Sequence, residues 1–437
     1  LDMAWPLIAE NVLQTAMGIV DIFLVAQLGA AAIAGVGSAV QVMFFVTAAL
    51  SALAVGSSVL VAQAVGAKES TKASQIAKQS LAWSMLFSLP LVLVGLLFPG
   101  QVIGIFGMEP DVTLIGAGYL RITMGTAFVM TLMIIAGGVL RGAGDSFSPM
   151  WITSLANLLN MWLTYGLIFG EFGFPELGVM GSAWGTLWSR CLGLVLMLVV
   201  MWIGRNGVSI RGAGHWAPNW ATAWQILKLG MPAALEQVLI SIAFTIMLIS
   251  IASLGTAALA AQRIALTALS LSYLPGIGFG IAATALVGQS IGAQRQDEGA
   301  AIAEIATNWA VGWMSIGGIL FFALATPIMQ QFSTDPDVVH IGAMTLQPVA
   351  IMQPFWAIFM VQSGALRGIG NTMLPLWLNA VGMWSSVGLG ILLLNTIGGG
   401  LPIMWTGFMF IIPLTSGLAW LRFNRAITHT KIQVAFN

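Results

Sequence analysis

The chain has 437 residues, of which 58% are hydrophobic and only 7% are charged, and its mean hydropathy is +0.95. Soluble domains carry roughly 25% charged residues, so this composition excludes a soluble fold and predicts an all-α polytopic membrane protein. A β-barrel would instead show short segments of alternating hydrophobicity. The formal net charge of zero indicates no particular partner, and the single cysteine, Cys191, excludes an internal disulfide and a multi-cysteine metal site.

Apolar runs separated by polar residues predict twelve transmembrane helices. Their expected ranges are 3–28, 32–63, 73–98, 114–140, 149–170, 181–204, 224–254, 257–289, 299–325, 340–366, 374–396 and 402–424. A helix needs about 20 residues to cross a bilayer, so the second and eighth ranges, which are longer, must tilt or extend beyond it.

The basic residues predict the orientation of these helices. Twelve of the fifteen lysines and arginines lie in or beside loops after even-numbered helices, or in the tail: Lys68, Lys72, Lys78, Arg141, Arg205, Arg211, Lys228, Arg295, Arg367, Arg422, Arg425 and Lys431. The loops after odd-numbered helices carry acidic residues instead. Because cytoplasmic loops are enriched in Lys and Arg, we expect both termini in the cytoplasm.

The two halves of the chain repeat each other at a constant spacing of 226 residues. The matching segments are Pro6–Leu13 and Pro232–Leu239, Leu60–Ala67 and Leu286–Ala293, Glu109–Val112 and Asp335–Val338, and Leu140–Asp145 and Leu366–Asn371. Two six-helix halves enter the membrane in the same sense, which is a known transporter plan, although a duplicated structural protein is an alternative. We therefore predict an N-terminal bundle over 1–204, a cytoplasmic linker over 205–223, and a C-terminal bundle with a short cytoplasmic tail over 224–437.

The carboxylate of Asp21 lies deep inside the first apolar range, where a charge costs about 2.5–3.5 kcal/mol on insertion scales. At 1.5 Å per residue it lies ~10 Å below the predicted outer end of its helix. Thr164 and Asn160, in the fifth range, lie ~9 Å and ~15 Å below the outer end of theirs. Similar depth allows one polar cluster, in which Asp21 couples proton movement to transport. The alternative is a carboxylate that is hydrogen-bonded for packing alone. The repeat counterpart of Asp21 is Met247, so the cluster is expected in the first half only.

Several of these motifs together resemble the multidrug and toxic compound extrusion (MATE) family. They are the first helix with Pro6 and Asp21, the L-G-x-x-A-I-A that follows it, the duplicated L-R-G-x-G-[DN] turn, and the block from Gly170 to Gly178. The resemblance covers essentially the whole chain, and the first helix is similar to the bacterial DinF-like branch. It implies twelve helices in two bundles forming a V, with export driven by inward flow of H+ or Na+.

The family resemblance also implies a site in the N-terminal bundle. This site combines the first-helix aspartate with an Asn-x-x-x-Asp/Asn pattern in the fifth helix, which in this chain is Asn160-x-x-x-Thr164. A hydroxyl therefore stands where the family has a second carboxylate or amide. Because Na+ favours several hard oxygen ligands including carboxylates, this departure favours H+ as the coupling ion.

Four residues share the Asp21 face of the first helix by their spacing: Gln14, Met17, Gly18 and Leu24. Gln14 is expected to join the polar cluster. The other three are candidates for lining a substrate cavity, although methionine packs in the core by default. Adaptable methionine and aromatic side chains in such a cavity would suit bulky, amphipathic, often cationic compounds.

Three further charged residues within predicted helices are candidates for a functional role. Glu10 and Glu236 are either helix-start acids favoured by the helix dipole, or a proton relay or gate on the inward side. Arg190 either neutralises a carboxylate or extends toward the interface. No metal-ligand spacing, nucleophile triad or nucleotide fingerprint is present, so we expect no enzyme, no metal and no cofactor.

These observations predict an H+-coupled multidrug efflux antiporter with Asp21 as its protonation switch, working by alternating access as a monomer in the bacterial cytoplasmic (inner) membrane. Its expected partners are small amphipathic or cationic drugs and the lipid bilayer, with no nucleic acid. The alternatives are a Na+-coupled drug antiporter, a lipid-linked saccharide flippase of the same superfamily, and a channel or non-transporting receptor.

Overall fold

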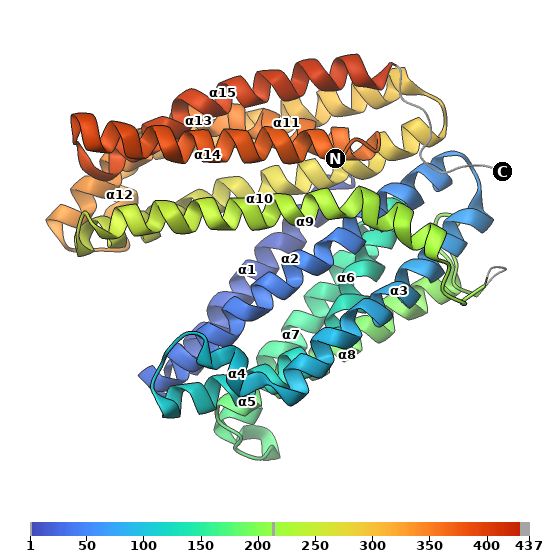
Figure 1. Ribbon diagram of the computed structural model, residues 1–437, viewed down its shortest axis with the longest axis horizontal. Coiled ribbons are helices and arrows are strands. Elements are labelled where there is room, and N and C mark those ends of the chain that lie inside the picture. The colour runs from blue at the N-terminus through green and yellow to red at the C-terminus, as the bar shows by residue number, and fades with distance from the viewer. Residues whose placement is uncertain (1, 212–214, 429–437) are drawn as a thin grey trace. The chain divides into compact units, whose positions relative to one another are not determined.

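The computed structural model describes residues 2–211 and 215–428, most of them in helices (Figure 1). The helices are α1 (Ala4–Ala26), α2 (Ala30–Gly66), α3 (Ser70–Leu97), α4 (Pro99–Gly104), α5 (Pro110–Gly125), α6 (Ala127–Gly142), α7 (Phe147–Phe169), the 3-10 helix η1 (Glu171–Gly173), α8 (Val179–Ile203), α9 (Trp220–Ala252), α10 (Thr256–Gly292), α11 (Gln296–Ala323), α12 (Ala325–Gln330), α13 (Pro336–Gly368), α14 (Met373–Ile397) and α15 (Gly400–Ile427). Within the described ranges, eleven helices are long and apolar enough to span a membrane, and the bent pair α5 and α6 makes a twelfth span. The protein is therefore an all-α polytopic membrane protein. Lys431, used to predict the orientation, lies outside the described residues.

One predicted span, 114–140, is not a single helix. It is divided at Thr126 into α5 and α6, with a bend of 49°. The hydroxyl of Thr126 donates to the carbonyl oxygen of Ile122 at 2.6 Å, and such back-bonding bends helices. Gly125, which precedes it, weakens the helix further. The repeat counterpart, α13, runs unbroken from Pro336 to Gly368.

The repeat is visible in the helix bounds. Adding 226 to the bounds of α2, α3 and α4 gives the bounds of α10, α11 and α12. The short helices α4 and α12, which the apolar runs did not predict, are therefore a feature of both halves. The repeated sequence therefore forms the same helices, with the same bounds, in both halves of the chain.

The chain forms two compact units (Figure 1). The N-unit is Ala9–Ala234, in which α2 packs against α3, α5 and α6, and α7 packs against α8. The C-unit is Leu1–Ile8 with Leu235–Asn437, in which α13 packs against α10, α11 and α15.

These boundaries differ from the predicted ones within α1 and α9. Ala4 and Leu7, at the start of α1, join the hydrophobic core of the C-unit. The start of α9 instead packs against α2 in the N-unit, where a Cβ atom added at Gly56 would overlap the carbonyl oxygen of Ile226. Both helices therefore pass from one unit to the other along their length.

Within the predicted linker over 205–223, the described residues 205–211 and 215–219 form no helix, and α9 begins at Trp220. The buried side chain of Gln79, on α3, binds the linker backbone at three points. Its Nε2 donates to the carbonyl oxygens of His215 (3.0 Å) and Ala217 (2.8 Å), and its Oε1 accepts from the Asn219 N–H (2.8 Å). The end of the linker is thus attached to the N-unit.

We expect Gly230→Ala to destabilise the protein by about 1–3 kcal/mol, because inserting a methyl group into a close-packed contact forces the backbone to shift. A Cβ atom at Gly230 would overlap the carbonyl oxygen of Ala52 on α2. Gly388→Ala in α14 is the matched control, since a Cβ atom there meets nothing within 4 Å. Thermal unfolding in detergent measures both, and equal melting temperatures for the two variants would contradict the close contact.

Candidate functional site

Asp21 is half-buried on α1 and meets Asn160 of α7. An ionised carboxylate only accepts hydrogen bonds, so the amide nitrogen of Asn160 faces it and donates to Asp21 Oδ1 at 3.2 Å. The amide oxygen then accepts from the hydroxyl of Thr186 (3.1 Å) and from its backbone N–H (3.2 Å). One buried amide therefore links α1 through α7 to α8.

Thr164 lies one turn beyond Asn160 on α7 and is completely buried. Its hydroxyl has no hydrogen-bond partner among the described residues. It packs instead against α8, where a Cβ atom added at Gly185 would lie 2.6 Å from Thr164 Oγ1. Thr164 therefore lies in the same helix interface as Asn160, without a hydrogen bond to Asp21.

The remaining residues predicted on the Asp21 face of α1 lie in different surroundings. Gln14 is exposed, and within the described chain no hydrogen bond joins it to Asp21 or Asn160. Met17 is half-buried, and Gly18 faces open space, since an added Cβ atom would meet nothing within 4 Å. Leu24 is buried, with 7% of its surface exposed, so it packs inside the protein in this structure instead of lining an open space.

Arg190 lies on α8 beside the Asn160 contacts. It follows Thr186 by four residues, so the two side chains share a helix face. The Tyr119 hydroxyl shares a hydrogen bond with Ser182 of α8. The two interpretations of Arg190, neutralising a carboxylate or extending toward the interface, both stay predictions.

Sequence reasoning missed Tyr119, Ser182, Thr186 and Ser189. Ser189 Oγ lies 3.3 Å from the Asn160 amide and donates to the Thr186 carbonyl oxygen at 2.9 Å. Polar residues at 182, 186, 189 and 190 follow the helical period, so a search for polar residues on one face of the sixth predicted span could have found them. Tyr119 does not belong to such a series of polar residues at helical spacing.

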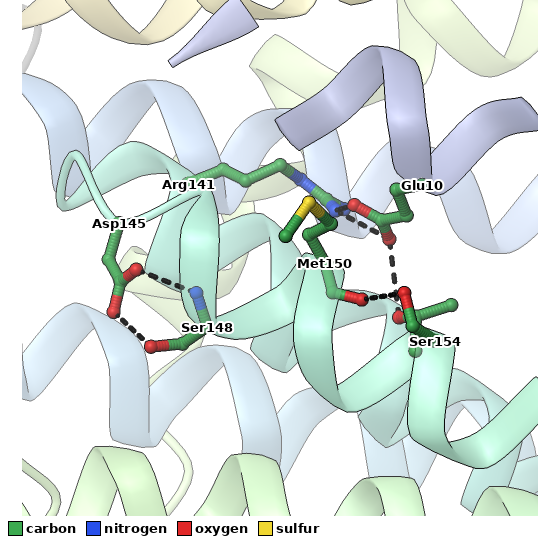
Figure 2. A network of polar contacts seen from close by, with 7 residues as sticks. Glu10, Arg141, Asp145, Ser148, Met150 and Ser154 are labelled. Carbon is green, nitrogen blue, oxygen red and sulfur yellow. Dashed lines mark hydrogen bonds and ion pairs between the residues drawn. The ribbon is translucent and has the colours of Figure 1, made fainter. Parts of the chain in front are cut away.

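Glu10 belongs to a separate polar network in the N-unit (Figure 2). The side chain is buried, and its carboxylate accepts from Arg141 Nη1 at 3.2 and 3.1 Å. Thr153 Oγ1, on α7, donates to Glu10 Oε1 at 3.4 Å. The ion pair therefore ties α1 to the end of α6.

The C-unit repeats this ion pair at the spacing of 226 residues. Arg367 Nη2 donates to both carboxylate oxygens of Glu236 at 2.8 and 2.7 Å, and Asn379 Nδ2 donates to Glu236 Oε1 at 2.7 Å. Neither α1 nor α9 has an acidic residue in its first turn, so the interpretation of Glu10 and Glu236 as helix-start acids is wrong. α9 begins at Trp220, well before the glutamate.

The repeated L-R-G-x-G-[DN] motif ends one helix and starts the next. In the N-unit Gly144 has a φ of +87°, a conformation that favours glycine, and the Asp145 N–H then reaches the Leu140 carbonyl oxygen at 2.9 Å. The Asp145 carboxylate accepts from the Ser148 N–H (2.9 Å) and hydroxyl (2.6 Å), which starts α7 (Figure 2). The C-unit repeats the turn at Gly370, also at +87°.

The same two halves match a known family. A family model described as MatE matches residues 6–166 and again residues 232–392, at the spacing of 226 that separates the repeats. The chain belongs to the MATE family of transporters. The internal repeat is thereby confirmed, and both matches begin at the prolines that open the duplicated Pro-x-x-x-Glu pattern.

Relatives and solved structures agree with the MATE assignment. A Thermotoga maritima protein, named a probable multidrug resistance protein NorM, is 31% identical over 97% of this chain and 91% of its own length. A Bacillus subtilis protein, named an uncharacterized transporter YisQ, is 24% identical over 93% and 90% of the two chains. An outward-facing multidrug resistance MATE family transporter has a TM-score of 0.90 at 22% identity, over 98% of this chain and 94% of that chain. The DinF-like branch stays a prediction, because these relatives carry other names.

Membership in the MATE family means a transporter and not an enzyme, as predicted. The part of this MATE chain that the structure describes holds no group of three or more His, Cys, Asp or Glu that could bind a metal. Asp21, Asn160 and Thr164 lie within the first segment that the MatE model matches, whereas Arg190 lies outside both segments.

Proposed function

We propose that this protein is an H+-coupled multidrug efflux antiporter of the bacterial cytoplasmic (inner) membrane, with both termini in the cytoplasm and Asp21 as its protonation switch. The observation that carries the proposal is the hydrogen bond between Asn160 and Asp21, because it sets an ionisable carboxylate against polar groups of two other helices. The name of the Thermotoga maritima relative, a probable multidrug resistance protein, supports drugs as substrates. We propose that it works as a monomer by alternating access.

Proton uptake at Asp21 would change the link between α1 and α8. The ionised carboxylate accepts from the Asn160 amide nitrogen, but a protonated carboxyl carries an O–H that must donate. If the amide turns its oxygen toward that O–H, its nitrogen faces α8 and donates to the hydroxyls of Thr186 (3.1 Å) and Ser189 (3.3 Å) instead, while the bond from the Thr186 N–H is lost. Protonation thereby changes the hydrogen bonds between the Asn160 amide and α8 and leaves the Thr186 N–H without its partner, which gives proton uptake on α1 an effect on the packing of α7 against α8.

Thr164 supports H+ over Na+ as the coupling ion. Na+ requires several hard oxygen ligands, and the Thr164 hydroxyl is packed against Gly185 while offering no charge. Arg190, a permanent cation on the same face of α8 as Thr186, would also disfavour a bound cation beside Asn160. A proton needs only one basic oxygen, which Asp21 supplies.

The energy available from one proton is sufficient for useful export. One pH unit supplies about 1.4 kcal/mol and 100 mV supplies about 2.3 kcal/mol, so together one proton supports a gradient of between two and three decades for a neutral substrate.

Proteoliposomes test the coupling ion directly. We expect ethidium movement driven by a pH gradient at constant sodium, and none driven by a sodium gradient at constant pH. Movement driven by sodium alone would assign Na+ coupling instead. Movement driven by neither gradient would remove the antiporter proposal.

A further inference from the structure

A groove lies at one end of the C-unit, between the end of α11, the short helix α12 and the start of α13 (Figure 1). Its volume is about 760 Å³, within the range of roughly 300–1,000 Å³ that is usual for sites of small molecules. Every residue that lines it falls within residues 322–347, so the groove is built by one continuous segment of the C-unit.

The groove changes from polar to apolar along α13. His340, Met344 and Gln347 share one face of this helix and all line the groove, with Gln347 ~10 Å along the axis from His340. Ser333 and Thr334, which precede α13, line the end at His340. The other end is apolar apart from Gln347, because Phe322 and Ala323 of α11 line it together with Met344.

The helix contact between α11 and α13 places Phe322 at the apolar end. A Cβ atom added at Gly318 would lie 2.7 Å from the carbonyl oxygen of Ala350, which fixes how far α11 extends beside α13. Phe322 lies one turn beyond Gly318 toward the end of α11, and consecutive spans run in opposite directions. Phe322 is therefore level with Gln347 and not with His340.

The apolar end of the groove opens onto the lipid-exposed surface of α11. This helix is apolar enough to span a membrane, and large side chains along its length are about half exposed, namely Trp309, Trp313, Ile316, Ile319, Leu320 and Phe322. Phe322 belongs both to this surface and to the groove. An acyl chain of the bilayer can therefore lie in the groove while it stays in contact with other lipid chains.

The polar side chains of the groove are not needed to build this corner of the fold. At the spacing of 226 residues the N-unit has Gly107, Met108 and Leu114 where the C-unit has Ser333, Thr334 and His340. The helices α4 and α5 nevertheless begin at the positions equivalent to the starts of α12 and α13. The hydroxyl and imidazole groups are thus an addition of the C-unit that folding alone does not explain.

Hydrogen-bond donors at the polar end remain available to a ligand. Ser333 Oγ accepts from the Asp335 N–H at 3.2 Å, so its own O–H is left to donate. The side chains of Thr334 and His340 form no hydrogen bond with another described residue. These three groups together could donate to the oxygens of a phosphate.

Two carboxylates at the same end determine which phosphate would fit. Asp335 and Asp337 are exposed, and neither forms an ion pair with a described basic residue. The Asp335 carboxylate accepts from the Asp337 N–H at 2.9 Å, which leaves its charge uncompensated. The two charges would repel an anionic headgroup and attract an ammonium group that is joined to the phosphate.

We propose that this groove binds one phospholipid with a zwitterionic, primary-amine headgroup such as phosphatidylethanolamine. Its phosphate accepts from Ser333, Thr334 and His340, and its ammonium donates to the aspartates. One acyl chain lies against Met344 and Phe322. A choline headgroup carries the same charges but has no N–H to donate, so it binds more weakly. Lipid binding at this groove is independent of the coupling ion and the cargo proposed above, although the proposed orientation places the lipid in the outer leaflet.

Photo-crosslinking in proteoliposomes tests the lipid and its place together. Three probes carry the same diazirine-labelled acyl chain on a phosphatidylethanolamine, a phosphatidylcholine or a phosphatidylglycerol headgroup, and mass spectrometry maps the labelled peptides. We expect the ethanolamine probe to label residues 322–347 about three- to fivefold more than either other probe, as suits charge contacts at an exposed site. Equal labelling by the three probes, or strongest labelling by the glycerol probe, would overturn the headgroup assignment.

Two variants with matched controls test the named residues. Asp337→Asn should remove most of the preference for ethanolamine over choline, whereas Asp111→Asn, at the equivalent exposed position of α5, should leave it unchanged. Met344→Trp should fill the groove and lower labelling of residues 322–347 by all three probes, whereas Met85→Trp, on the exposed face of α3, should not. Undiminished labelling in Met344→Trp would overturn the site. Ethidium transport by wild-type protein in the same vesicles reports on the export function separately.

Discussion

Replacing Asp21 with asparagine should abolish drug-driven proton exchange while leaving the protein folded in the membrane. An asparagine oxygen accepts a hydrogen bond from the Asn160 amide much as the carboxylate does, so the contact between α1 and α7 is retained. The amide cannot take up a proton near neutral pH, so the step that changes this contact is lost. The rate of proton movement on adding ethidium, followed with a pH-sensitive dye in proteoliposomes, should fall to that of protein-free vesicles.

Asp145→Asn provides the matched control for this experiment. Asp145 starts α7 by accepting two hydrogen bonds from Ser148, and asparagine is an equally good residue at a helix start. The control should therefore exchange protons at nearly the wild-type rate. Wild-type exchange by Asp21→Asn would show that the proton is carried elsewhere, whereas loss of exchange in both variants would indicate a general defect.

Most of the fold was predictable because apolar length and internal repetition are both visible in the sequence. Each of the twelve predicted ranges overlaps a helical span, since hydrocarbon thickness sets the length of every apolar run. The helix ends were less predictable: α2 and α10 extend to Gly66 and Gly292, beyond the apolar runs. The bend at Thr126 was missed because hydropathy registers the apolar character of a span and not a local break in its helix.

The candidate site was only partly predictable from the sequence, because residue spacing gives the depth of a side chain but not the helix that it faces. Asp21 and Asn160 stand out as polar groups at similar depth, and the structure brings them together. Whether they faced each other depended on how α1 packs on α7, which residue spacing does not determine. Thr164, at the same predicted depth, turns its hydroxyl toward Gly185 instead. The partners on α5 and α8 came from helices that no sequence argument placed beside α1.

The ion pairs of Glu10 with Arg141 and of Glu236 with Arg367 were also only partly predictable from the sequence. Sequence repetition revealed Glu10 and Glu236, but it did not reveal that the arginine of each L-R-G motif would neutralise them. The chain enters the N-unit at Ala9 and the C-unit at Leu235, one residue before each glutamate. Each ion pair therefore attaches a helix to its unit directly after the helix enters it. Breaking one should loosen that attachment as well as bury an unpaired charge.

Glu236→Gln should destabilise the protein by about 3–5 kcal/mol, because the guanidinium of Arg367, only 25% exposed, then loses its counter-charge. Adding Arg367→Met to the same chain should recover much of that loss, since the unpaired charge is then removed. Glu298→Gln is the matched control: Glu298 and Arg295 are 51% and 62% exposed, and an exposed pair contributes only about 0–1 kcal/mol. Unfolding of the purified protein in detergent measures all three variants. Two outcomes would contradict the expectation that each charge of this pair stabilises the other. One is a Glu236→Gln variant that is no less stable than Glu298→Gln. The other is a double variant that is less stable than Glu236→Gln alone.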